Sequence, residues 1–512
     1  MTPHFRPALL AAALAPLFAN PVLAQNKELD PVVVTATRQA QRISETIADV
    51  TVLEQEHIER SSASTLGELL GRVAGIEFSR TGSRGAAESL YIRGTESSHT
   101  LMLIDGVRFG SATLGTSPLE MIPLNQISRI EIVRGPASSI YGSDAIGGVI
   151  NIITRREQPG STVSLGYGNR GSYEAALSTA QTLDRLRVSA RVGFSGSDGI
   201  NSLTSTGNPF YNSDKDGTNN RNGSLDLRYQ LNPDSEIGAS HLESHSRTRI
   251  DNALYDPNFF TYSSANLDYK NQDKITRSSV FARSRFSDSW TSQLQFGQSQ
   301  NISEQNLPTT LGQPPQKFTT NQDQVAWQND VKLPLGNALV LLEHLGQRVG
   351  GTQSYATSAR TINSASLGWN GQIDAHTWQL NTRHDNNSQF GEKTTYTAGY
   401  GFRLTPLWRL SGSIGTAFKA PTFNDLYYPN DGFGQGNAAL KPETSKNTEL
   451  AARYDDGRNL LKLTWFKNEI KDLIQWAPTA NPFFWTPSNV GKAEIDGWEL
   501  QGSTRIGDWQ LA

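Results

Sequence analysis

The sequence predicts a large antiparallel transmembrane β-barrel that follows a compact α+β domain. From about residue 159 to the last residue, apolar and polar side chains alternate with a period of two. Segments of about 10 residues with one wholly apolar face suit a barrel wall, which meets lipid outside and water inside. Aromatic residues lie near the segment ends, and short turns alternate with long polar connections. A soluble β-helix or a multi-domain adhesin is the alternative.

The composition excludes several other classes. The chain has 512 residues, no cysteine, 36% hydrophobic residues and a net charge of −3. Without cysteine there is no disulfide scaffold, thiolate metal site or cysteine nucleophile. The low apolar content excludes a bundle of membrane-spanning helices, because each needs about 20 apolar residues in a row. The weak charge excludes nucleic acid bound over the whole chain.

The first 24 residues have the pattern of a secretory signal peptide. Arg6 precedes an apolar stretch over residues 8–18, and Val22-Leu23-Ala24 ends in the manner of a cleavage site. A buried N-terminal helix is the alternative. We therefore predict export, with cleavage near Ala24.

Residues 42–156 are predicted to form the compact α+β domain. Thr65-Leu66-Gly67-Glu68 fits a capping box, apolar residues then recur at helical spacing, and Gly75 is expected to end that helix. Short apolar runs beside glycine-bearing turns predict strands at 101–104, 130–133 and 148–153.

Beyond residue 159, period-two alternation is clearest in four segments. They are 186–194, 225–231, 396–404 and 408–414. The whole region has room for roughly 17–18 strands. Because the chain ends in what looks like the middle of a strand, we expect a C-terminally incomplete barrel; a genuine short variant is the alternative.

Five stretches resemble motifs of a known family. They are 30–38 (DPVVVTATR), 91–95 (YIRGT), 103–107 (LIDGV), 133–136 with 141–153 (VRGP and YGSDAIGGVINII), and 418–421 with 440–443 (FKAP and LKPE). On these residues the chain is similar to the TonB-dependent outer-membrane receptors, and most closely to the cobalamin receptors of the BtuB type. The resemblance implies a 22-stranded barrel in the outer membrane of a Gram-negative bacterium. Residues 42–156 would be a plug in its lumen that faces the periplasm, and about four strands would be missing here.

The resemblance also implies a TonB box within the periplasmic segment 25–41. Its residues are Asp30, Pro31, Val32, Val33, Val34, Thr35 and Ala36. A flexible β-branched run of this kind can add a strand to the exposed sheet edge of a partner. The partner would be TonB, energised by the inner-membrane proteins ExbB and ExbD. A first strand of the plug sheet is the alternative.

Matching positions imply a plug–barrel latch and a ligand surface. Arg93 and Arg134 of the plug would face Glu449 and Glu499 of the barrel, with ordinary surface charge as the alternative. The ligand positions are Ala87, Ser89, Glu96, Leu114, Gly115, Ile250, Asp251 and Asn252. The family pattern has Leu, Ser and Asn at the first three, so only Ser89 is retained, and Ile250 stands where the family has Tyr.

Acidic residues cluster in two long connections. They are Asp198, Asn212, Asp214, Asp216, Asp251 and Asp268, where Asn212 stands in place of a family Gln. Clustered carboxylate and amide oxygens can supply the six to eight ligands that Ca²⁺ takes. The cobalamin receptors carry calcium loops at matching positions, so calcium is expected here; a solvated acidic loop is the alternative.

The expected function is therefore binding and import of cobalamin by a monomer in outer-membrane lipid. No Gly-x-Ser-x-Gly or His-Glu-x-x-His motif and no phosphate loop occurs, so an enzyme is not indicated. A siderophore or haem receptor is the alternative within the family, although residues 421–439 lack the histidine usual for haem. A passive porin or an adhesin would need neither a plug nor a TonB box.

Overall fold

The computed structural model describes residues 32–512, apart from 155–158, 204–210, 252–253, 257–260, 264–268, 307–314, 508 and 512. The predicted signal peptide, Asp30, Pro31, Asn252 and Asp268 lie outside the described residues. No helix in the described part of the chain is long and apolar enough to cross a membrane.

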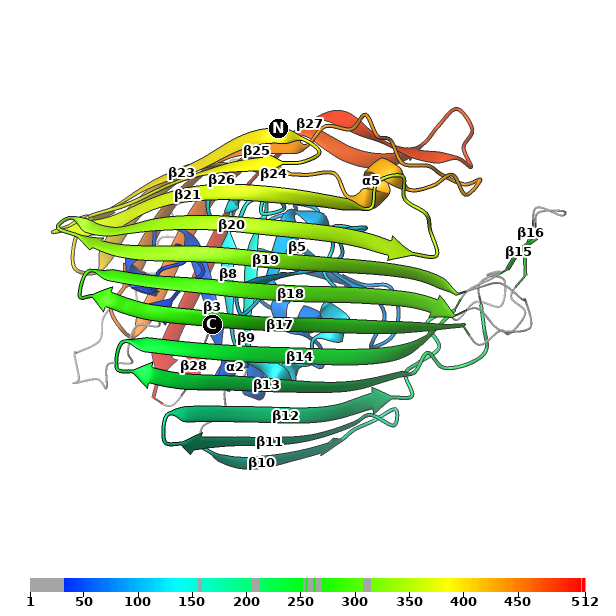
Figure 1. Ribbon diagram of the computed structural model, residues 1–512, viewed down its shortest axis with the longest axis horizontal. Helices are drawn as coiled ribbons and strands as arrows, with labels where there is room; N and C mark the ends of the chain where they lie inside the picture. The colour runs from blue at the N-terminus through cyan, green and yellow to red at the C-terminus, as the bar shows by residue number, and fades with distance from the viewer. Residues whose placement is uncertain are drawn as a thin grey trace, which may run out of the picture.

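One antiparallel sheet forms the barrel wall (Figure 1). Within the described residues it has 17 strands, and successive strands in the sheet follow one another along the chain. They are β10 (Gly160–Tyr167), β11 (Tyr173–Leu183), β12 (Leu186–Ser197), β13 (Thr218–Asn232), β14 (Ser235–Ile250), β17 (Tyr269–Ser287), β18 (Trp290–Asn306), β19 (Gln316–Leu333), β20 (Gly336–Gly351), β21 (Ala359–Ile373), β22 (His376–Asn387), β23 (Gly391–Arg403), β24 (Trp408–Lys419), β25 (Glu443–Asp455), β26 (Asn459–Pro478), β27 (Trp485–Ile506) and β28 (Trp509–Leu511). The predicted antiparallel barrel is confirmed.

The direction of the side chains distinguishes a membrane barrel from a soluble sandwich. Along β21, exposed and buried residues alternate. Leu367 is 58% exposed on the outside, whereas Ser366 and Ser364 are buried on the inside. A wall that is apolar outside and polar inside needs lipid around it and a polar filling within it.

The two ends of the barrel differ. The hairpin of β15 (Leu254–Asp256) and β16 (Thr261–Ser263), the helix α5 (Phe423–Tyr427) and the β26–β27 hairpin lie at one end (Figure 1). Short turns join the strands at the other end. The described elements of the long connections therefore lie at one end of the barrel.

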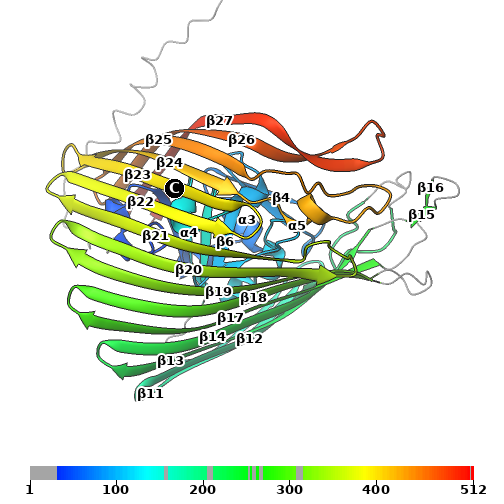
Figure 2. The same cartoon turned by 45° about the horizontal axis from the view of Figure 1, so that its top comes forward.

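The plug lies within the curve of the sheet (Figure 2). Its central sheet has five strands in the order β3-β8-β9-β6-β7, and β6 and β9 are parallel. Its elements are β3 (Asp49–Glu54), α2 (Gln55–Arg60), α3 (Leu66–Leu70), β4 (Ile76–Arg80), β5 (Glu88–Ile92), η3 (Ser97–His99), β6 (Thr100–Ile104), β7 (Val107–Phe109), η4 (Leu119–Met121), η5 (Leu124–Gln126), β8 (Ile127–Arg134), α4 (Ser138–Tyr141) and β9 (Gly148–Thr154). The predicted strands correspond to β6, β8 and β9.

The predicted helix in the plug is shorter than expected. Thr65 caps α3 by accepting the Glu68 N–H, but the helix ends at Gly71 instead of Gly75. Phe78 packs so closely on Gly71 that a Cβ there would lie 2.7 Å from the Phe78 Cβ. Gly75, at φ +73°, instead forms the turn into β4.

Candidate functional site: the plug–barrel interface and the loop-end cavity

Six charged side chains meet between the plug and the barrel wall. The plug contributes Asp49, Arg93 and Arg134, and the barrel contributes Glu449 of β25, Lys462 of β26 and Glu499 of β27. Arg93 lies 2.9 Å from Glu449 and 2.8 Å from Glu499. Asp49 pairs with Arg93 at 2.7 Å, and its other oxygen with Lys462 at 2.6 Å. Three carboxylates thus balance three cations.

The latch differs in detail from the predicted pairing. Arg134 lies 3.2 Å from Asp49 and donates to the Ala74 carbonyl at 2.7 Å, whereas Arg93 holds both barrel glutamates. Burial alone would raise the pKa of the Asp49 carboxyl, but the adjacent Lys462, Arg134 and Arg93 hold that pKa well below its ordinary value. Asp49 therefore remains charged at physiological pH.

Two glycines make room for the barrel carboxylates. Gly75 and Gly135 have φ values of +73° and +84°. A Cβ at Gly75 would lie 1.9 Å from Glu499 Oε1, and one at Gly135 would lie 2.2 Å from Glu449 Oε1. Any larger residue would push these glutamates away from Arg93.

The described part of the predicted TonB box is folded against the plug, which corrects the expectation of a flexible segment. β1 (Val32–Val33) pairs with β2 (Gln41–Arg42), just before η2 (Ile43–Glu45), and does not join the plug sheet. The buried Glu131 carboxylate accepts hydrogen bonds from Val34 N at 3.0 Å and Thr35 N at 2.7 Å. Tyr141 donates to the Thr35 carbonyl at 2.9 Å. Val33, Thr35 and Ala36 are buried.

A cavity of about 430 Å³ lies between the plug and α5 at the end of the barrel with the long connections. Its lining residues are Glu96, Ser98, Thr113 and Leu114 of the plug and Lys419, Thr422, Asn424, Asp425, Tyr428, Ile474 and Trp476 of the barrel. Trp476 donates its Nε1–H to Asp425 at 2.9 Å and meets Tyr428 edge to face. Burial raises the pKa of the Glu96 carboxyl. The cavity thus combines aromatic faces with hydrogen-bond acceptors.

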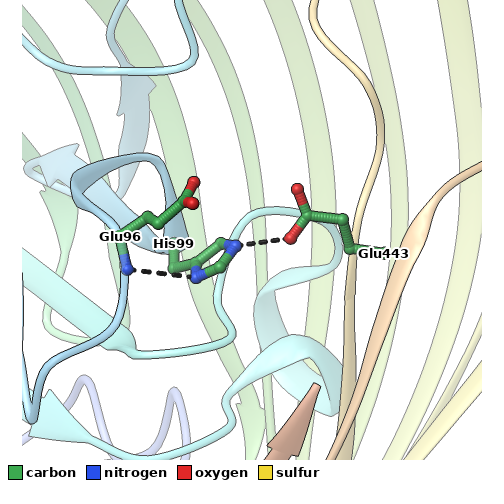
Figure 3. Close-up of side chains that lie close together, drawn as sticks. All are labelled: Glu96, His99 and Glu443. Carbon is green, nitrogen blue, oxygen red and sulfur yellow. Dashed lines mark hydrogen bonds and ion pairs between the residues drawn. The ribbon is translucent and has the colours of Figure 1, made fainter. Parts of the chain in front are cut away.

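Beside this cavity, His99 joins the plug to the barrel (Figure 3). The Glu96 N–H donates to His99 Nδ1 at 3.3 Å, so the other ring nitrogen, Nε2, carries the proton toward Glu443 Oε2 at 2.5 Å. Glu443 also accepts from Lys419 at 3.2 Å. Glu96, His99 and Glu443 are of metal-ligating type. However, both nitrogens of His99 are engaged and Lys419 pairs with Glu443, so we interpret the group as a plug–barrel contact.

The predicted calcium residues are only partly brought together. The carboxylates of Asp214, Asp216 and Asp251 offer oxygens within 4.8 Å of one another. Asn212 is 2% exposed and Asp216 is 3% exposed. Both amide atoms of Asn212 and Asp216 Oδ1 have no hydrogen-bond partner among the described residues. The Asp198 carboxylate lies elsewhere, beside Gly171.

The acidic cluster is electrostatically strained. Burial, together with the charges of Asp216 and Asp214, raises the pKa of Asp251 to about 6. Carboxylates crowded in this way favour a cation among them.

Only some of the predicted ligand positions lie at this cavity. Glu96 and Leu114 line the cavity, and Gly115 lies beside it, where a Cβ would be 2.9 Å from Thr422 Cγ2. Ala87 and Ser89 belong to the β4–β5 hairpin instead, and Ile250 ends β14.

Sequence comparison decides the family. Residues 158–512 match the TonB dependent receptor-like β-barrel, and residues 42–149 match the TonB-dependent receptor plug domain. The chain belongs to the TonB-dependent receptors. It is accordingly an outer-membrane transporter whose plug faces the periplasm.

Curated relatives belong to this family, and solved structures share the fold. The vitamin B12 transporters BtuB of Photobacterium profundum and Vibrio vulnificus are 34% and 32% identical to the receptor, over 98% of its chain and 80% of theirs. The ferric enterobactin receptor PfeA of Pseudomonas aeruginosa has a TM-score of 0.74 at 19% identity, over 93% of this chain and 80% of that one. The siderophore receptor PirA of Acinetobacter baumannii has a TM-score of 0.72 at 20% identity, over 90% of this chain and 78% of that one. At such identities the structural likeness shows the fold alone.

Several residues of the receptor's interface were not predicted. Asp49 and Lys462 are 413 positions apart, and no local pattern relates them. Glu131 lies within a predicted strand and His99 lies just before another. The sequence pattern predicts the strands, but it does not show that these side chains bind distant parts of the chain.

We expect Asp49→Asn to weaken plug docking by about 3 kcal/mol, because it leaves Arg93, Arg134 and Lys462 with only two carboxylates at this interface. The measurement is the urea concentration at which the plug of the purified receptor becomes protease-sensitive. The control is Glu494→Gln, since Glu494 pairs with Lys467 at an exposed site on the barrel and should contribute less than about 1 kcal/mol. Equal stability of wild type and Asp49→Asn would contradict the latch.

Proposed function

We propose that the receptor binds cobalamin at the cell surface and imports it into the periplasm, energised through TonB with ExbB and ExbD. The observation that carries this proposal is the similarity to transporters named for vitamin B12, at 32–34% identity over 98% of the chain. The cavity beside α5 would receive part of the ligand.

The charges of the cavity support this ligand class. Among the described residues that line it, Lys419 is the only cation, and it is already paired with Glu443. Glu96 and Asp425 add carboxylates. A ferric catecholate siderophore is a multiply charged anion and would meet no uncompensated cation here. A corrinoid carries peripheral amide N–H donors and apolar faces, which match carboxylate acceptors and the Trp476–Tyr428 pair.

A siderophore remains the second candidate, because solved structures of siderophore receptors share the fold. That likeness comes at 19–20% identity and carries no argument about the ligand. The cavity charges favour cobalamin over it.

Coupling to TonB would require release of the segment held by Glu131. Val34 and Thr35 would then be free to add a strand to the partner's sheet edge, with main-chain hydrogen bonds supplying affinity. We infer that the docked segment is the resting arrangement and that transport draws it out toward the periplasm.

We propose that Asn212, Asp214, Asp216 and Asp251 hold a calcium ion. The residues fit this ion, because the carboxylate oxygens of the three aspartates converge. Side-chain oxygens of Asn212, Asp216 and Asp251 are also buried without a hydrogen-bond partner among the described residues. Calcium would order the two loops and raise ligand affinity by preorganisation. Asp198 and Asp268 remain predicted ligands only. The carboxylate of Asp198 lies beside Gly171, and Asp268 lies outside the described residues.

The ligand assignment predicts that the purified receptor binds cyanocobalamin more tightly than ferric enterobactin. Trp476→Ala should weaken cyanocobalamin binding about tenfold, because it removes an aromatic anchor. Trp498→Ala is the matched control, since that indole is 69% exposed on the barrel surface. Isothermal titration calorimetry measures the dissociation constants of the wild type and of both variants. Tighter binding of the ferric catecholate would overturn the cobalamin assignment.

The calcium assignment predicts a pH dependence. Because the pKa of Asp251 is raised to about 6, protons compete with calcium below that pH, and affinity should fall about tenfold between about pH 7.5 and about pH 5. Asp251→Asn should weaken binding and flatten this profile, whereas Asp456→Asn, at a short turn between β25 and β26, should do neither. Calcium affinity that is constant over this pH range would contradict the assignment.

A further inference from the structure

The plug hairpin β4–β5 is hydrogen-bonded to the loop that carries the proposed calcium site. Ser83, in the turn of this hairpin, is buried and donates its hydroxyl to the Asp216 carbonyl. The Ser83 N–H donates to Ser202 Oγ at 3.2 Å. The Ser202 N–H donates in turn to Asp216 Oδ2 at 2.8 Å. These three residues form a closed ring of hydrogen bonds between the plug and a barrel loop.

A second contact lies beside this ring. Thr248 near the end of β14 is 3.0 Å from Thr218 at the start of β13, and its hydroxyl donates to the Gly85 carbonyl at 3.2 Å. The loops that leave these two strands bear the proposed calcium ligands. The hairpin is therefore held by the same two strands that position the cation site.

Asp216 belongs both to the proposed calcium site and to the ring of hydrogen bonds with Ser83 and Ser202. Its Oδ1 has no partner among the described residues and belongs to the carboxylate cluster, whereas its Oδ2 and its carbonyl hold Ser202 and Ser83. Without a cation, repulsion from Asp214 and Asp251 acts on the residue that holds the plug. A bound cation would reverse that force.

We propose that calcium binding at Asp216 locks the plug hairpin, residues 80–88, to the barrel loop through Ser83 and Ser202. This inference rests on the calcium site proposed above and adds a role for it. The ion then stabilises the docked plug as well as the surface loops. Coupling between two binding equilibria is reciprocal. If calcium favours attachment of the hairpin to the loop by some factor, then attachment of the hairpin must raise calcium affinity by the same factor.

The absence of native cysteine allows a direct test with one engineered pair. In Gly82→Cys/Ser202→Cys, the Cβ at residue 82 would lie 3.8 Å from the Cβ at residue 202, which suits a disulfide. The thiol–disulfide equilibrium of the full-length receptor is measured in a dithiothreitol redox buffer, with and without calcium chloride. The calcium dissociation constant is measured on the oxidised and the reduced forms.

We expect the oxidised form to bind calcium about tenfold more tightly, and calcium to shift the disulfide equilibrium by the same factor. In a receptor without the engineered pair, Ser83→Ala should weaken calcium binding. The matched control is Thr81→Val, because the Thr81 hydroxyl bonds to Ala87 within the same hairpin.

The outcomes separate the two proposals. Calcium affinity that is equal in the oxidised and reduced forms, with binding itself intact, would overturn the lock and leave the calcium site standing. Absence of calcium binding to the wild-type receptor would overturn both.

Discussion

The charge balance around Asp49 is the constraint on which the rest of the receptor depends. A barrel wall that faces lipid outside must face the lumen with polar groups, so the plug has to present a polar surface to it. Polar groups buried between them must be paired, because each orphan is costly. Asp49, Glu449 and Glu499 meet this requirement with Arg93, Arg134 and Lys462. Buried ion pairs of this kind add little net stability, but removing one partner leaves a costly unpaired charge.

Other contacts extend this arrangement from one end of the plug to the other. The N-terminal segment docks on Glu131, and His99 meets Glu443 beside the cavity near α5. Glu443 and Glu449 lie on the same strand, β25, and Arg93 and His99 lie close together along the plug sequence. The segment from Arg93 to His99 is therefore pinned along β25 at two points. Glu96 lies between these two points and lines the cavity. A ligand bound in the cavity would therefore contact the segment that is held against β25.

The sequence predicted the architecture of the receptor much better than it predicted the contacts between the plug and the barrel. The alternation in 186–194 and 396–404 identified β12 and β23, because one face of each of these segments is apolar. The helix at Leu66 was foreseen from its cap, but its end at Gly71 was not, and the close approach of Phe78 to Gly71 depends on the tertiary fold. Arg93 was foreseen as a latch residue through the resemblance. Asp49 and Ser83 were not, because their partners lie far away in sequence and only the closed fold brings them together.

If the receptor imports its ligand as proposed, the plug held by the charges around Asp49 must move away from the barrel wall for the ligand to pass. A disulfide between β7 and β18, made by Val107→Cys/Gly297→Cys, tests it directly, because a Cβ at residue 297 would lie 3.3 Å from the Val107 Cβ. Energised uptake of labelled cyanocobalamin is measured in cells under oxidising and reducing conditions. We predict that the disulfide abolishes uptake without affecting surface binding and that a reductant restores uptake. Uptake at the wild-type rate with the disulfide fully formed would contradict the account.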